Sequence, residues 1–291
     1  MANLKDIRTR ISSVKSTMQI TNAMKMVSAA KLKKAQEAIE SMRPYAEKLN
    51  ELLVSLSQGV DSDVAGAYAE IRSVKKVLVV LITSNRGLCG ALNSNAIKEA
   101  KKLLDNYRSS GIDADVLTIG KRGYDALKKE YNIIDNRSDV YEKNFSYDKI
   151  ISIAENIMQQ YVNKEYDKVI LVYNEFINPG LQKPVSETFL PIEKQEEQSG
   201  SDFIDYIFEP SQEEIVRELI PKSLKTRFFR AIREAWASEH GARMTAMHKA
   251  TDNAKEMVED LTLQYNKARQ AVITGEILEI VSGAEALKNQ G

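Results

Sequence analysis

The first sixty residues place apolar side chains at alternating steps of four and three positions. These positions are Ile7, Ile11, Val14, Met18, Leu32, Ala35, Ile39, Met42, Ala46, Leu49, Leu53 and Leu56. All of them share one heptad register, which is the pattern of a coiled-coil seam. No glycine falls between about Leu4 and Ser57, and the one proline, Pro44, could kink the helix. The pattern predicts a helix over residues 1–60, which at ~1.5 Å per residue is too long for an ordinary globular helix.

The C-terminal part of the chain has a similar pattern and predicts a second long helix over residues 208–288. Its expected seam runs through Leu224, Phe228, Ala231, Ala235 and Ala242, and after a register shift through Met247, Ala250, Ala254, Met257, Leu261, Ala268, Ala271 and Leu278. Neither helix can bury such a stripe alone, so we expect the two helices to pair. Because the middle of the chain must return to the start of the pair, the expected pair is an antiparallel coiled coil.

The middle of the chain, residues 70–195, follows a different pattern. Continuous apolar runs rich in β-branched residues alternate with amphipathic segments, which predicts an open, Rossmann-like α/β sheet. The expected strands lie at 75–84, 113–120 and 167–177, with an edge strand at 183–192, and the expected helices at 93–111, 121–131 and 146–166.

The stretch "TNAMKMVSAAKLKK", residues 21–34, breaks the regular pattern of the first helix. If the seam continues through it, polar residues take the core positions: Thr21, Lys25 and Ser28. Several apolar residues then lie off the seam: Ala23, Met24, Met26 and Val27. One interpretation is a local register shift, since a 3.6-residue helix drifts against a 3.5-residue repeat. The other is that the off-seam residues contact a surrounding partner, for which flexible methionine is well suited.

Charge and cysteine content narrow the function classes. The chain has 41 basic and 41 acidic residues, which disfavours a nucleic-acid binder. The first 36 residues nevertheless hold eight basic residues and one acid, as expected for a solvated helix face or an acidic partner. A single cysteine, Cys89, excludes an internal disulfide and suggests a reducing compartment. We find no secretory signal, and the longest apolar run, at 77–82, is too short to span a bilayer.

Candidate catalytic chemistry is sparse. The segment "TSNRGLCGALNSN", residues 83–95, follows a strand and opens a helix, where α/β domains can bind phosphate, but it fits neither glycine-rich phosphate motif. A structural turn with Cys89 packed as a small hydrophobe is the favoured interpretation. The two histidines, His240 and His248, have no metal-binding context and are expected on the helix surface. A nucleotide-dependent enzyme stays an alternative that lacks its motif.

Two long motifs at opposite ends of the chain carry a resemblance to a known family. "DIRTRISSVKSTMQITNAMKMVSAAKLKKAQ" and "ASEHGARMTAMHKATDNAKEMVEDLTLQYNKARQAVITGEILEIVSGAEAL" resemble the gamma subunits of bacterial F-type ATP synthases, and "RGLCGALNSN" fits the same family. The resemblance implies a non-catalytic rotary shaft for ATP synthesis and hydrogen-ion transport. The implied partners are the hexamer of alpha and beta subunits, the epsilon subunit and the c-ring. It further implies no cofactor, metal, nucleic acid or membrane insertion, and a peripheral place on the cytoplasmic face of the bacterial inner membrane.

The same resemblance implies particular contact residues. Met24 and Lys25 match the segment near the beta subunit's acidic lever, and Arg243 matches a basic residue coupled to that segment. Contacts with beta loops high on the shaft are implied for Arg269, Gln270, Thr274, Glu276 and Glu279. Tyr206 and Arg86 are implied near the foot, toward the c-ring or epsilon subunit. Gly275 departs from the longer polar residue of many members, and a glycine inside a helix costs about 1 kcal/mol relative to alanine.

Overall fold

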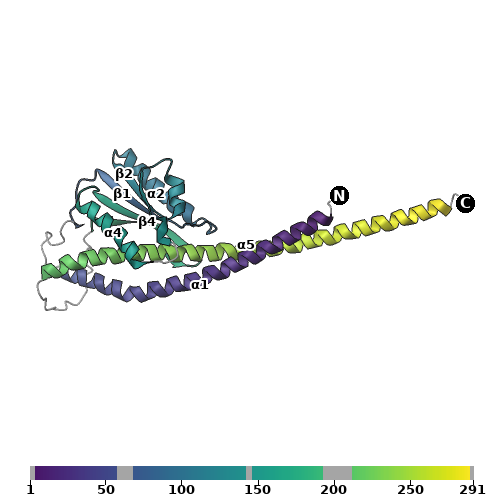
Figure 1. The fold of residues 1–291 in the computed structure, drawn as a ribbon, viewed down its shortest axis with the longest axis horizontal. Coiled ribbons are helices and arrows are strands. Elements are labelled where there is room, and N and C mark those ends of the chain that lie inside the picture. Colours follow the sequence, from purple (N-terminus) through teal and green to yellow (C-terminus); the bar gives the residue numbers. More distant parts are fainter. Residues whose placement is uncertain (1–3, 58–67, 142–145, 193–211, 289–291) are drawn as a thin grey trace. The chain divides into compact units, whose positions relative to one another are not determined.

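The computed structural model describes residues 4–57, 68–141, 146–192 and 212–288 (Figure 1). Two long helices lie at the ends of the chain: α1 spans Leu4–Ser57 and α5 spans Gln212–Lys288. The chain forms two compact units, one joining the chain up to Val27 with the chain from Met244 onward, and the other comprising Ser28–Arg243. The division predicted at 1–60, 70–195 and 208–288 stays a prediction. Tyr206 lies outside the described residues.

The larger unit contains a mixed five-stranded sheet in the order β3-β2-β1-β4-β5. Its strands are β1 (Lys76–Ile82), β2 (Asp113–Ile119), β3 (Ile133–Asn136), β4 (Lys168–Asn178) and β5 (Leu181–Leu190). The first four run parallel along the sheet, and β5 pairs antiparallel with β4 at the edge. The predicted α/β sheet is confirmed, including its edge strand. The sequence pattern missed the four-residue β3, which is too short to show periodicity.

Helices cover both faces of the sheet. On one face α2 (Leu92–Ser109) and α3 (Lys121–Leu127) pack against Val77, Val79 and Leu81 of β1. On the other, α4 (Tyr147–Val162) and α5 pack against Leu78, Val80 and Ile82 (Figure 1). A short 3-10 helix, η2 (Ser138–Tyr141), precedes α4. Because β1 is buried on both sides, its sequence is a continuous apolar run and not an alternating one.

The first part of α5 packs on the sheet, which corrects one sequence-based assignment. Four residues expected to face the N-terminal helix belong to the core of the sheet instead: Leu224, Phe228, Ala231 and Ala235. This segment of α5 is buried on more than one side, so a 3–4 spacing cannot tell which neighbour it faces. Close approach continues at Gly241, where an added Cβ would lie 3.2 Å from Phe176 and 3.2 Å from the Cα of Pro179.

The two long helices run antiparallel within each unit. In the larger unit the charge of Lys31 acts on Glu239, and the charge of Arg43 acts on Glu234. Since the residue number rises along α1 as it falls along α5, the helices run in opposite directions. In the smaller unit Thr251 donates its hydroxyl to Thr21 at 2.8 Å. The predicted antiparallel pair is confirmed, and α1 continues through Pro44.

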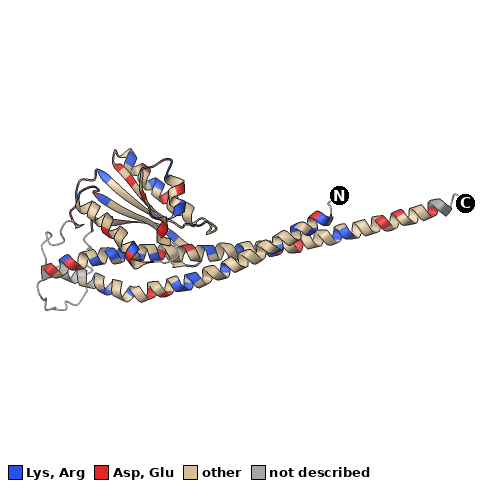
Figure 2. Cartoon of the chain, in the orientation of Figure 1, with Lys and Arg blue, Asp and Glu red and all other residues tan. Residues whose placement is uncertain are grey.

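Within the described part of the chain, every helix is too short or too polar to cross a bilayer. The apolar surface of both long helices is instead interrupted by charged residues, which Figure 2 shows along α1 and α5.

Candidate functional site

The irregular stretch of α1 keeps its heptad register. The seam positions Thr21 and Lys25 are half-buried and Ser28 is 3% exposed, whereas the off-seam residues Met26 and Val27 are 59% and 56% exposed. The alternative of a local register shift is therefore wrong. The polar residues occupy the seam, and the apolar ones face away from it.

The exposed apolar edge of this stretch differs in detail from the prediction. Met24 and Lys25 are both half-buried, so neither side chain is as outward as Met26. Ile20, which sequence reasoning missed, is 60% exposed and extends the edge by more than one turn. The spacing in the sequence indicates this exposure, because Ile20 lies two positions after the seam residue Met18 and cannot face the same neighbour.

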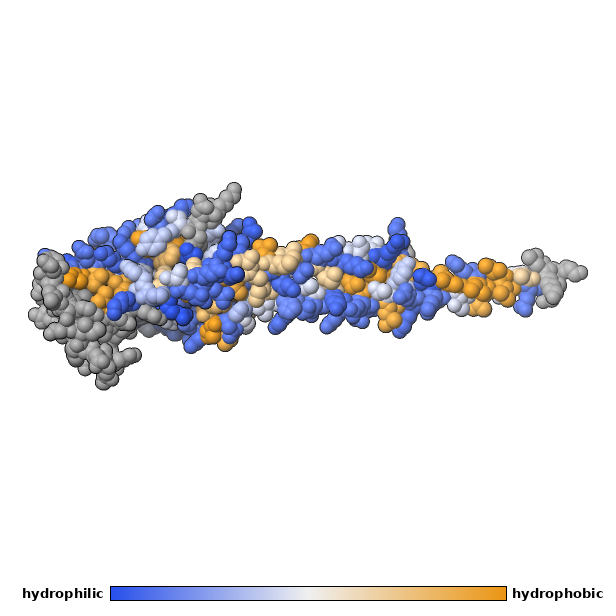
Figure 3. Space-filling view, turned by 90° about the horizontal axis from the view of Figure 1, so that it is seen from below, coloured by the Kyte–Doolittle hydropathy of each residue, from blue (hydrophilic) through white to orange (hydrophobic). Residues whose placement is uncertain are grey.

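The far end of α5 is exposed on all sides. The five polar residues predicted to contact a partner there are exposed: Arg269, Gln270, Thr274, Glu276 and Glu279. Large apolar residues among them and directly after them are exposed too: Ile273, Ile277, Leu278, Ile280 and Val281. Figure 3 shows apolar side chains gathered near this end of the chain. Such a stretch of apolar surface on a lone helix indicates contact with another protein.

The end of the helix pair explains this exposure and corrects the predicted seam. Counted back from the Thr21–Thr251 contact in an antiparallel pair, Leu4 comes opposite Ala268. Residues beyond Ala268 therefore lie past the first residue of α1, and Ala271 and Leu278, expected in the seam, are exposed. Met257 is also exposed, and Val258 is the half-buried residue at that turn.

Arg243 is buried, and its guanidinium contacts other groups of the same chain. Its Nη1 donates to Glu239 Oε1 at 2.7 Å, and its Nη2 donates to the backbone carbonyls of Arg86 at 3.1 Å and Gly87 at 3.2 Å. The Nε also donates to Gly87 O, at 3.3 Å, and the residue is 8% exposed. Burial raises the pKa of Glu239, and Arg243 opposes that shift. The predicted role of Arg243 as a direct partner contact remains a proposal.

The loop that Arg243 holds, residues 83–91, has a packed interior. Asn93 donates to Ser84 Oγ at 2.8 Å and to Cys89 Sγ at 3.2 Å, and Ser84 Oγ donates to Arg86 O at 2.6 Å. Cys89 packs with Leu92 and Ala242. Burial raises the pKa of the Cys89 thiol, which keeps it protonated and makes it a poor nucleophile. The favoured interpretation of a structural turn with a packed cysteine agrees with this geometry.

His240 contradicts its predicted place on the helix surface. It is 4% exposed, and among the described residues neither ring nitrogen has a hydrogen-bond partner. Burial, with the charges of Arg243 and Lys31, lowers its pKa to about 3, so the ring is neutral near pH 7. His248 is exposed as predicted, with Nδ1 3.5 Å from Asp252 Oδ2. The described residues contain no group of three potential metal ligands.

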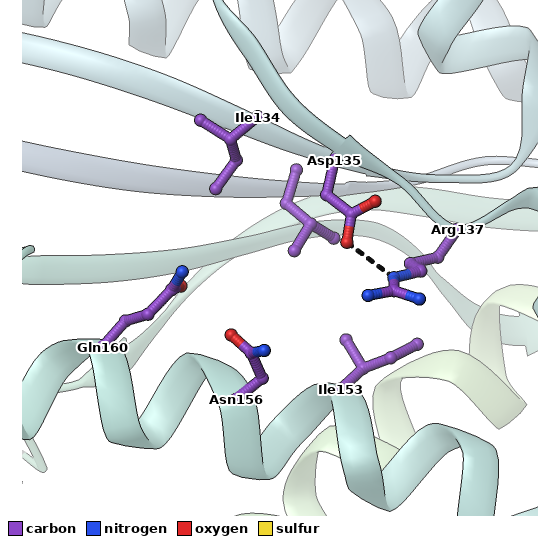
Figure 4. Close-up of a pocket in the computed structure, with 7 residues that line it drawn as sticks. Ile134, Asp135, Arg137, Ile153, Asn156 and Gln160 are labelled. Carbon is purple, nitrogen blue, oxygen red and sulfur yellow. Dashed lines mark hydrogen bonds and ion pairs between the residues drawn. The ribbon is translucent and has the colours of Figure 1, made fainter.

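A groove of about 150 Å³ lies between β3 and α4. Asp135 and Arg137 form an ion pair at 2.6 Å on one wall, and Asn156 and Gln160 face it from α4 (Figure 4). The Gln160 Oε1 is buried without a partner among the described residues. The groove holds one neutralised charge pair and two amides, with no nucleophile or general-base arrangement in its lining.

Comparison with known proteins shows the family to which the chain belongs. Residues 3–287 match a sequence model of the family described as ATP synthase. The ATP synthase gamma chain of Flavobacterium psychrophilum is 58% identical over 288 residues, covering 99% of this chain and 100% of that one. The chain therefore belongs to the ATP synthase gamma-chain family.

Solved structures support the same fold. A chain of the Tetrahymena thermophila mitochondrial ATP synthase central stalk and c-ring matches with a TM-score of 0.59 and 26% identity, covering 79% of this chain and 99% of that one. A chain of the Euglena gracilis mitochondrial ATP synthase in rotational state 3 matches with a TM-score of 0.65 and 21% identity, covering 98% and 94%. The second likeness concerns the fold alone.

Proposed function

We propose that this chain is the rotary shaft in the central stalk of an F-type ATP synthase. It couples ion-driven rotation of a c-ring to conformational changes at catalytic sites on beta subunits, and it catalyses no reaction itself. The observation that carries the proposal is the pair of exposed apolar edges, at Ile20–Val27 of α1 and Ile273–Val281 of α5. The gamma-chain relatives and the central-stalk match support it.

The proposed partners are those that the family resemblance implies. The helices pass into a hexamer of alpha and beta subunits, while the α/β domain meets the epsilon subunit and the c-ring. This arrangement sets the chain at the cytoplasmic face of the bacterial inner membrane as a peripheral subunit. The matched Tetrahymena structure contains a central stalk and a c-ring, which supports the c-ring as a partner.

Two contact surfaces are proposed for the beta subunits. The first is the α1 edge of Ile20, Met26 and Val27, together with the half-buried Met24 and Lys25. The second is the exposed end of α5, with Arg269, Gln270, Thr274, Glu276 and Glu279. Arg86, whose side chain is exposed, and Tyr206 are proposed as contacts toward the foot.

The composition of these surfaces suits a shaft that must meet three equivalent neighbours in turn. Their exposed apolar residues are aliphatic or methionine, and such residues bury area without the aromatic anchors that concentrate binding energy at hot spots. Exposed aliphatic side chains contribute roughly 25 cal/mol per Å² when covered, whichever apolar neighbour covers them. A contact of this kind supports the shaft at each angle without locking it at one.

The proposal is tested by reconstitution with alpha and beta subunits and the membrane sector. We expect ATP hydrolysis to drive proton pumping only when this chain is present, and the chain alone to hydrolyse no ATP. Equal hydrolysis and equal pumping without the chain would contradict the shaft function. Hydrolysis by the isolated chain would contradict its non-catalytic character.

A further inference from the structure

The loop at residues 86–88 has an unusual backbone and an exposed tip. Leu88 adopts φ of 63°, a left-handed conformation that a branched side chain rarely takes without support, and its side chain is 63% exposed. Strained backbone of this kind persists only where the surroundings hold it. The exposed Arg86 lies two residues before Leu88, so the loop presents one cation and one aliphatic side chain to solvent.

We propose that Arg243 is a positioning residue that holds the 86–88 loop in this shape, and that it acts on the neighbouring subunits through the loop and not by touching them. The inference rests on the proposed function for the identity of those neighbours. The loop geometry itself is independent of that function.

The contacts of Arg243 require an arginine. Three of its nitrogens donate to two successive carbonyls, of Arg86 and Gly87, and to the Glu239 carboxylate on the previous helical turn. A planar guanidinium can reach all three acceptors from one position, whereas a lysine ammonium is a single point charge. Glu239 fixes the rotation of the fork, because it binds Nη1 and leaves the other nitrogens directed at the loop.

The two ends of the loop also have anchors of their own. Ser84 and Asn93 hold its start, and Cys89 with Leu92 packs its end on Ala242. In the middle, Arg243 donates to the carbonyls of Arg86 and Gly87, and Ser84 Oγ also donates to Arg86 O. Cys89 follows this segment directly and packs on Ala242, the residue before Arg243, so loosening of the middle should reach the thiol. At Gly87 an added Cβ would lie 2.7 Å from Arg122 Nη2, so the Arg122 side chain lies close against this part of the loop.

The first test uses Cys89 as a reporter in the full chain. Cys89 is the one cysteine of the sequence and is 2% exposed, so a thiol reagent measures the opening of the loop beside it. We expect Arg243→Lys to raise the modification rate at least tenfold at unchanged helix content. Arg269→Lys, at an exposed position of the same helix, is the matched control and should leave the rate unchanged. An unaltered rate in folded Arg243→Lys would overturn the proposal.

The second test separates action through the loop from direct contact, in the reconstituted complex. Leu88→Gly removes the exposed side chain while a glycine keeps the left-handed backbone. The double-mutant cycle combines the Arg86→Ala/Leu88→Gly variant with Arg243→Lys. We expect their losses in protons pumped per ATP hydrolysed to be non-additive. Once the two loop side chains are removed, Arg243→Lys should lower the number of protons pumped per ATP hydrolysed only slightly further. Additive losses would show direct contact by Arg243 and overturn the proposal. Because the cysteine assay needs no partner, its result stands even if the shaft function fails.

Discussion

Trp236 meets the ring of His240 edge-on, with 5.0 Å between ring centroids, one helical turn apart on α5. The aromatic contact and the helix around it bury the imidazole completely enough to deprive both nitrogens of hydrogen bonds within the described chain. A neutral imidazole tolerates this site far better than a cation does, because Arg243 and Lys31 already place positive charge nearby.

His240 should make the fold sensitive to acid. Its pKa is about 3 in the folded chain against an ordinary 6.5, so the folded state resists binding a proton that the unfolded state accepts. The stability that a neutral His240 provides is present above pH 6.5 and is lost as the pH falls from 6.5 toward 3. The expected slope between these limits is up to about 1.4 kcal/mol per pH unit.

Chemical denaturation between pH 7.5 and 4.5 measures this effect. His240→Gln should flatten the pH dependence, because an amide does not titrate in this range. His248→Gln changes an exposed histidine and should leave the slope unaltered. A wild-type slope that survives in His240→Gln would rule out the imidazole as its source.

Gly241→Ala should destabilise the larger unit by about 1–3 kcal/mol, as overpacking typically does. The added methyl would press on Phe176 and on the backbone of Pro179, each 3.2 Å away, and backbone cannot give way as a flexible side chain can. The free energy of unfolding from a urea titration measures the change. A neutral effect would mean that the β4–β5 hairpin moves freely away from α5.

Gly275→Ala is the matched substitution with the opposite expected sign. No atom lies within 4 Å of an added Cβ at this position, and the residue sits inside α5. Alanine should therefore stabilise the helix by up to about 1 kcal/mol, the usual difference in helix propensity. Amide hydrogen exchange over residues 270–280 should slow in this variant, and faster exchange would disprove the reasoning.

Lys25→Glu should alter coupling more than folding. The residue is a half-buried polar position in the seam of α1, and reversing its charge changes the interaction proposed with an acidic partner. We expect fewer protons pumped per ATP hydrolysed in the reconstituted complex, with a melting temperature of the isolated chain within a few degrees of wild type. Unchanged pumping would remove the proposed role of Lys25.

The amino-acid sequence by itself determined the long helices and the buried strand β1. These features follow from local periodicity, which a helix or strand expresses wherever it lies. The family motifs at both ends of the chain could also be recognised from the sequence alone. The contact residues at the exposed end of α5 came from the family resemblance, and their contact role stays a prediction.

Only the tertiary structure decided which neighbour each face of α5 meets. Phe228 and Ala235 keep a coiled-coil spacing but pack on the sheet, and His240 is polar but buried, because a helix enclosed on several sides has no single apolar stripe. Arg243 likewise finds its acceptors more than 150 residues away, at Arg86 and Gly87. Contacts between segments so distant depend on how the chain folds back on itself, and no local pattern in the sequence records them.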